Sequence, residues 1–131
     1  MVELEIAIDL DTNFDDAIAK TTQAFKEHGF GVLTEIDVKK TFEVKLNVTD
    51  FERYQILGMC NPPLAKKGLD LDRRIGTLLP CNVYVQELEQ NKTRVSAINP
   101  EAMFSVLNDP KFGNLVNEVK TKINLAMNAL K

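Results

Sequence analysis

Three times along the chain a polar residue is followed directly by a proline. The pairs are Asn61-Pro62, Asn99-Pro100 and Asp109-Pro110. An Asn or Asp side chain can accept a hydrogen bond from a free amide of the first helical turn. Proline is favoured at the first helical position, because the amide it lacks would have no helical partner there. Each pair therefore predicts the start of a helix, and the first pair also ends a strand expected over residues 52–60.

Two hydrophobic periodicities define the other elements. Apolar and polar residues alternate over residues 2–8, which is typical of a strand with one wet face. Apolar residues recur every three or four positions over residues 14–28 and again from Pro110 onward, which predicts two amphipathic helices. Gly29 is predicted to end the first helix in a left-handed conformation. The remaining expected elements are a strand over 31–36, a helix over 38–46 capped by Asp37, a short turn through Leu64 and Ala65 closed by Gly68, a polar connector over 69–76, a hairpin of strands 78–88 and 93–98, and a helix over 100–107.

This order of elements predicts an α+β fold with a largely antiparallel sheet and helices packed on one face. The chain has 131 residues, of which 44% are hydrophobic and 27% charged. Such a chain fits a single domain over residues 1–131 that can bury a core without disulfides or metal. No cofactor is expected, because the sequence lacks the glycine-rich phosphate-binding motifs and the zinc-protease motif.

The charge balance and the histidine content exclude several classes of function. Sixteen basic and nineteen acidic residues give a net charge of −3, so we expect no nucleic-acid partner. One histidine cannot build a metal site that needs two or three imidazoles. That residue, His28, ends the first expected helix, where a cation suits the helix dipole, and we interpret it as a capping residue.

The amino-terminal residues and the cysteine count indicate a compartment. The first residues of the chain include acidic ones and alternate between apolar and polar. A secretory leader would instead have basic residues followed by a continuous apolar run. No apolar run approaches the ~20 residues that span a bilayer. Two cysteines are too few for a secreted disulfide framework. We therefore expect a cytoplasmic protein with free thiols and no membrane partner.

The two cysteines are the first candidates for a site. Cys60 ends one expected strand and Cys81 begins the next long one. Antiparallel pairing would place both sulfurs at the same end of the sheet, where cross-strand Cβ atoms lie ~5 Å apart. Such a pair could carry sulfur or electrons, and the helix that follows Cys60 would favour a thiolate. The alternative is that both are small buried hydrophobic residues, which is the commoner role of cysteine.

Arg73 and Arg74 are further candidates, because a guanidinium binds a carboxylate or phosphate through two parallel donors. Asp70 and Asp72 lie beside them in the sequence. These acids could instead neutralise the two arginines as ordinary surface charges, which is the commoner case.

Four segments carry a recognisable pattern, namely residues 14–17, 30–38, 58–65 and 76–85. Together they resemble the bacterial and archaeal family called domain of unknown function 302. The resemblance implies a small α+β domain similar to a single TATA-box-binding-protein-like unit with extra elements, a homodimer, and no established activity. The Cys-Asn-Pro and Pro-Cys-Asn segments of the family fall on residues 60–62 and 80–82. Asn61 and Asn82 therefore join the two cysteines as candidate site residues.

Two functions are consistent with these observations. The first is a non-catalytic homodimeric module that binds a small molecule or a partner protein between the sheet and the helices, because the scaffold is strongly amphipathic and has few catalytic side chains. The alternative is a thiol-based carrier of sulfur or electrons that uses Cys60 and Cys81.

Overall fold

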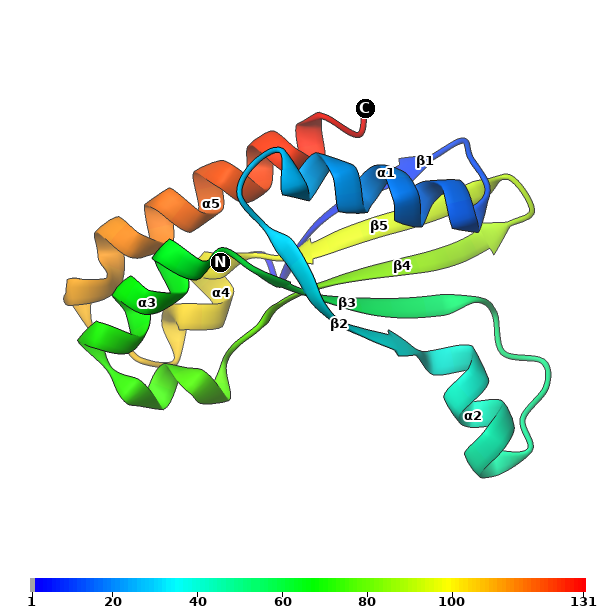
Figure 1. Ribbon diagram of the computed structural model, residues 1–131, viewed down its shortest axis with the longest axis horizontal. Helices are drawn as coiled ribbons and strands as arrows, with labels where there is room; N and C mark the ends of the chain where they lie inside the picture. The colour runs from blue at the N-terminus through cyan, green and yellow to red at the C-terminus, as the bar shows by residue number, and fades with distance from the viewer. Residues whose placement is uncertain (1) are drawn as a thin grey trace.

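The computed structural model describes residues 2–131, and over these residues it contains a five-stranded sheet (Figure 1). All four strand pairs are antiparallel, and the spatial order is β1-β5-β4-β3-β2. The predicted α+β class and antiparallel sheet are confirmed. The strands are β1 (Glu5–Leu10), β2 (Gly31–Asp37), β3 (Tyr54–Cys60), β4 (Cys81–Glu89) and β5 (Lys92–Ile98).

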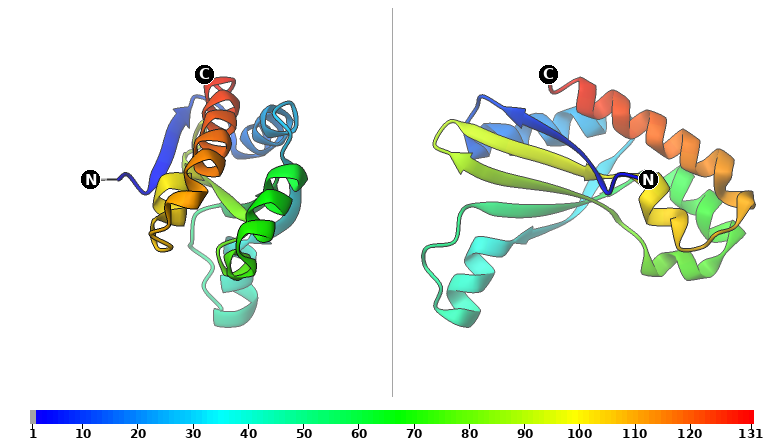
Figure 2. Two further views of the ribbon diagram at one scale, coloured as in Figure 1. Left: turned by 90° about the vertical axis from the view of Figure 1, so that its left-hand side faces the viewer. Right: turned by 180° about the vertical axis from the view of Figure 1, so that it is seen from behind.

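The helices occupy three places around this sheet. Helices α1 (Phe14–Lys26) and α5 (Gly113–Asn128) lie side by side over one face (Figure 2). Helices α3 (Pro62–Leu71) and α4 (Pro100–Ser105), with the 3₁₀ helices η1 (Arg73–Thr77) and η2 (Pro110–Phe112), lie beyond one end of the strands. Helix α2 (Val38–Leu46) projects from the opposite end of β2 and has no buried residue. The prediction of helices on one face therefore holds for α1 and α5 only.

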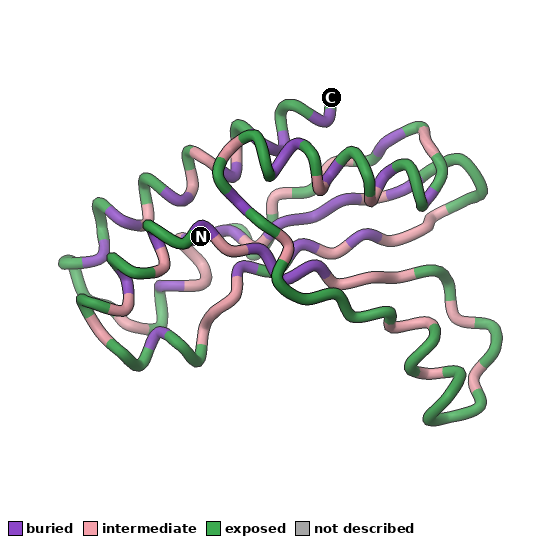
Figure 3. Tube along the Cα trace, in the orientation of Figure 1, coloured by how far each residue is buried: buried purple, intermediate pink, exposed green. Residues whose placement is uncertain are grey.

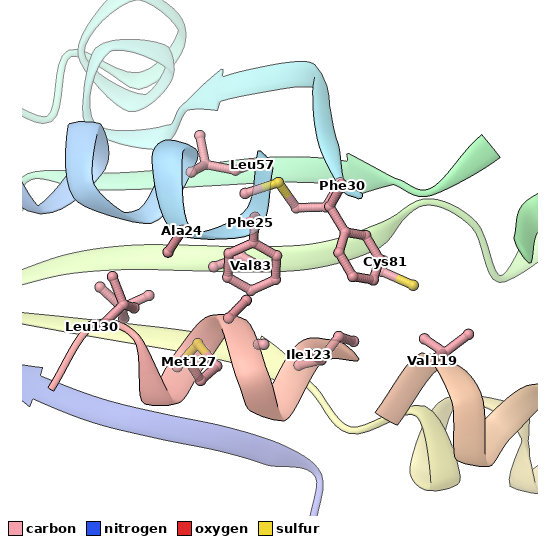
Figure 4. Packing of buried hydrophobic residues seen from close by; sticks show 14 of the residues in the cluster. Ala24, Phe25, Phe30, Leu57, Cys81, Val83, Val119, Ile123, Met127 and Leu130 are labelled. Carbon is pink, nitrogen blue, oxygen red and sulfur yellow. The ribbon is translucent and has the colours of Figure 1, made fainter. Parts of the chain in front are cut away.

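The core lies between the sheet and the helices α1 and α5, where buried residues concentrate (Figure 3). On β4 the side chains of Cys81, Val83 and Val85 face this core, whereas those between them point to the uncovered face of the sheet. Phe25 of α1 and Ile123 of α5 pack against the same side (Figure 4). The alternation along β4 is the pattern expected of an antiparallel strand with one face on the core.

Two of the three polar-proline pairs begin helices as predicted. The side chains of Asn61 and Asn99 are the N-caps of α3 and α4. The third pair behaves differently, because Asp109 caps the 3₁₀ turn η2 and α5 begins only at Gly113. The Phe112 amide donates to the Asp109 carbonyl three residues back, which is the 3₁₀ pattern.

The end of α1 confirms the predicted role of Gly29. Gly29 has φ +88°. The Phe30 amide donates to the Phe25 carbonyl and the Gly29 amide to the Lys26 carbonyl, which together form a Schellman motif. The rings of Phe25 and Phe30 meet edge to face with centroids 5.6 Å apart. This contact directs the chain from α1 into β2.

The segment after β3 was predicted wrongly. The expected short turn is the ten-residue helix α3, and Gly68 lies within it rather than closing it. A Cβ atom at Gly68 would collide with the Ile75 side chain, so glycine serves there for close packing of α3 on η1. The start of β1 also differs from the prediction, because its pairing with β5 begins at Glu5 and not at Val2.

Gly58 generates a stability prediction. A Cβ atom at this buried position in β3 would collide with the Thr34 hydroxyl and lie 2.8 Å from Cγ of Pro80. We expect Gly58→Ala to lower the free energy of unfolding by about 1–3 kcal/mol. Gly31→Ala, in the adjacent strand with no atom within 4 Å of its Cβ position, is the matched control and should change stability by less than about 0.5 kcal/mol. Urea denaturation measures both, and equal effects would contradict the packing seen around Gly58.

Candidate functional site

A cavity of about 360 Å³ lies where β3 and β4 meet α3, η1 and α5. This volume lies within the range of small-molecule sites in proteins. None of the residues that line it is charged, and the polar ones are Thr34, Asn61 and the two cysteines. The apolar lining includes Phe30, Met59, Leu64, Leu69, Ile75, Leu79, Phe104, Leu115 and Val119.

The cavity exists because α3 continues beyond the sheet end instead of folding back over it. Pro62 and Pro63 lack the amides that would extend the β3 ladder. The Asn61 side chain accepts a hydrogen bond from the Leu64 amide and begins α3 at that point. Leu64 and Ala65 of α3 then form one wall, opposite Leu115 and Val119 of α5. The second wall comes from a helix about fifty residues further along the chain.

The structure places both cysteines at this cavity. Cys60 is the last residue of β3 and Cys81 the first of β4. Cys81 is paired with Met59, so Cys60 lies one position beyond the pair. Both thiols are free, and both residues line the cavity. Phe30, another lining residue, is labelled together with Cys81 in Figure 4.

The surroundings of both thiols favour the protonated form. Burial raises the pKa of the Cys60 thiol. Burial also raises the pKa of the Cys81 thiol to about 11, with a smaller contribution from the negative charge of a Cys60 thiolate. The N-terminus of α3, expected to favour a Cys60 thiolate, is outweighed by this loss of hydration. At neutral pH the two side chains therefore act as apolar surface with weak S–H donors.

The other sequence candidates lie elsewhere. Arg74 donates to Asp72 from Nε at 3.1 Å and from Nη2 at 2.7 Å, and this hydrogen bonding lowers the pKa of Asp72 to about 2. Arg73 pairs with Asp70 at 3.5 Å. The aspartates that precede the two arginines in the sequence therefore neutralise them. Asn82 is exposed and lines a shallow groove on the uncovered face of the sheet.

Sequence reasoning missed the apolar cavity wall. Leu79, Phe104 and the two α5 residues Leu115 and Val119 come from three separate segments, and each fits the periodicity of an ordinary core residue. No local pattern distinguishes an apolar side chain that faces another side chain from one that faces a cavity. Asn61, in contrast, was found through its place in the Cys-Asn-Pro segment.

Comparison with known proteins identifies the family. The model of the family described as "Domain of unknown function DUF302" matches residues 6–130. The chain belongs to the DUF302 family. The resemblance of the four sequence segments is thereby confirmed. No curated protein matches this DUF302 chain.

A solved structure of the same family is similar over nearly its whole length. It is described as "Crystal structure of uncharacterized conserved protein DUF302 from Bacillus stearothermophilus". The TM-score is 0.90 at 22% identity, and the match covers 99% of this DUF302 chain and 100% of that one. The likeness establishes a shared fold. Among residues 2–131 no helix is long and apolar enough to cross a membrane.

The raised pKa of Cys81 predicts a pH dependence of stability. Between pH 9 and 11 the unfolded chain binds fewer protons than the folded protein, so stability falls as the pH rises through this range. A shift of two pKa units, at about 1.4 kcal/mol each, corresponds to a loss of about 3 kcal/mol. Urea denaturation at several pH values measures this loss.

Cys81→Ser is the variant to compare in these experiments, because serine does not ionise in this range. We expect its stability to change less than that of the wild type between pH 9 and 11. Parallel curves for the two proteins would show that Cys81 ionises as easily in the folded state as in the unfolded state.

Proposed function

We propose that this DUF302 protein is a non-catalytic module that binds a small apolar molecule in the cavity between the strand ends and α3. The supporting observation is the cavity itself, which has about 360 Å³ of space and no charged residue in its lining. Burial of apolar ligand surface contributes roughly 25 cal/mol per Å² to binding, so an apolar molecule can bind here without an ionic contact.

The alternative function, a thiol-based carrier of sulfur or electrons, is less well supported. A carrier thiol attacks as a thiolate and therefore needs a pKa near or below the ambient pH. The pKa values of Cys60 and Cys81 are both shifted upward. The same burial that disfavours a thiolate makes the two side chains suitable walls for an apolar ligand.

Filling the cavity should weaken ligand binding. Ala65 is half-buried on α3 and lines the cavity, so the ring of Ala65→Phe can occupy the space that a ligand would take. We expect this variant to bind a neutral apolar fluorescent probe such as Nile red at least about tenfold more weakly than the wild type. Fluorescence titration measures the affinity, and thermal unfolding checks that the variant is folded.

Ala19→Phe is the control, because Ala19 is exposed on α1 and does not line this cavity. It should bind the probe with the affinity of the wild type. If no apolar probe binds the wild type with one-to-one stoichiometry, or if Ala65→Phe binds as well as Ala19→Phe, the proposed function is wrong.

We also propose that the protein forms a homodimer through the arm made of β2 and α2. Helix α2 has nine residues and buries none of them, and a helix this short has little stability without packing. Leu33, Val44 and Leu46 on the arm are each 63–67% exposed. A second copy would cover this apolar surface.

Two further expectations remain predictions. One is the likeness to a TATA-box-binding-protein-like unit, which the family resemblance implies. The other is a cytoplasmic location, which the two free cysteines support.

Sedimentation equilibrium at micromolar concentration tests the dimer. We expect twice the monomer mass for the wild type, and a shift toward the monomer for Leu46→Lys, because a charge would be buried in the interface. Leu125→Lys, at an exposed leucine on α5, is the matched control and should leave the mass unchanged. A wild type that sediments only as a monomer would overturn this proposal.

A further inference from the structure

A groove of about 230 Å³ lies on the face of the sheet that α1 and α5 leave uncovered. Ile56, Tyr84 and Ser96 are paired in one row across β3, β4 and β5, so their side chains share this face. Glu5 and Ile98, a pair between β1 and β5, lie beside that row. These residues line the space, which we call the sheet groove. Among residues 2–131, none of its lining residues also lines the cavity beside α3.

Two hydroxyl groups hold the carboxylate of Glu5 in the sheet groove. Its Oε2 atom accepts a hydrogen bond from the Tyr84 hydroxyl at 3.0 Å and another from the Ser96 hydroxyl at 2.7 Å. Ser96 is only 1% exposed, so packing fixes the position of this donor. No side chain or amide of residues 2–131 donates to Oε1, and no lysine or arginine of that range forms an ion pair with Glu5. One oxygen of an oriented carboxylate is therefore available to a ligand.

The negative charge of Glu5 has no counter-charge in the groove. Among residues 2–131, it is the only charged residue of the lining. Arg94, on the same face, donates to Asp9 from Nε at 2.7 Å and from Nη2 at 3.1 Å. Hydrogen bonding to Asp9 is the main cause of the raised pKa of Arg94, and the charge of Glu5 is the smallest. Burial raises the pKa of Tyr54 and of Tyr84, and Glu5 adds to both shifts, so its field extends over the two rings.

Aromatic and apolar surface surrounds this carboxylate. The rings of Tyr54 and Tyr84 are stacked with their centroids 5.1 Å apart and an angle of 8° between their planes. Ile56 and Ile98 extend the apolar surface on either side of β4. Aromatic rings attract cations through their electron-rich faces, and proteins use them to recognise ammonium groups. A cation that carries an alkyl chain fits both the charge and the apolar part of the lining.

We propose that the sheet groove binds an alkylammonium ion, whose N–H group donates to Oε1 of Glu5 and whose alkyl chain lies against Ile56 and Ile98. This site is separate from the apolar cavity and goes beyond the function proposed for that cavity. Glu5 would repel an anion, and a neutral molecule of the same shape would lose the ionic contact.

The two tyrosines of the chain report on this site, because both of them line the sheet groove. Hexylammonium chloride and 1-hexanol are titrated at pH 7 and constant ionic strength into protein with isotope-labelled tyrosine rings. The chemical shifts of the rings then give the dissociation constants of the two compounds at this groove. We expect hexylammonium to bind the wild type about threefold or more tighter than 1-hexanol, which has the same chain and no charge.

Glu5→Gln tests the role of the carboxylate, because glutamine keeps an oxygen that can accept the same two hydrogen bonds and lacks the charge. Glu52→Gln is the matched control. Glu52 accepts a hydrogen bond from Gln86 at 2.9 Å and its charge also raises the pKa of Tyr54, but it does not line the sheet groove. We expect Glu5→Gln to weaken hexylammonium binding about threefold or more, and Glu52→Gln to leave it unchanged within about 1.5-fold.

Three results would overturn the inference. The first is that hexylammonium does not bind the wild type, or binds no tighter than 1-hexanol; this comparison needs no variant and decides the matter even if Glu5→Gln does not fold. The second is an equal effect of the two substitutions. The third is a change of the ring shifts when the protein alone is diluted, which would show that a second copy covers the groove. None of these results bears on the apolar cavity, because neither tyrosine lines it.

Discussion

The hydrogen bond between Asn61 and the Leu64 amide determines where the cavity lies. Pro62 and Pro63 end the β3 ladder, and the Asn61 cap begins α3 at the same point, so the helix continues past the sheet and not across its face. This arrangement leaves the ends of β3 and β4 uncovered by α1 and creates a space that α5 closes from the other side.

Local chemistry in the sequence was enough to predict much of the fold. The Asn61, Asn99 and Gly29 positions each define a helix terminus through interactions with residues two to five positions away, and these interactions are present in the structure. The length of α3 could not be predicted in this way. Gly68 is tolerated inside the helix because Ile75 packs closely against it, and this contact depends on the path of the chain through η1. From the sequence alone, a glycine inside a helix cannot be distinguished from a glycine that ends one.

Only part of the candidate site could be predicted from the sequence, for a similar reason. The antiparallel pairing of β3 and β4 brings Cys60 and Cys81 to one end of the sheet, although the connection between the two strands contains α3 and η1. Their protonation depends on burial by distant residues, which no local pattern records. The sequence left open whether the thiols are reactive or packed, and the upward pKa shift of Cys81 favours packing. The role of Arg73 and Arg74 was easier to judge, because their aspartate partners are neighbours in the chain.

The central claim is that the space beside α3 is a binding site for a small apolar molecule. Intermolecular nuclear Overhauser effects between 2-decanone and the methyl groups of the isotope-labelled protein test it most directly. The account predicts contacts to Leu64, Leu79 and Val119, which reach the cavity from three different parts of the chain. Contacts confined to Ile56 and Ile98, in the groove on the uncovered face of the sheet, would contradict it.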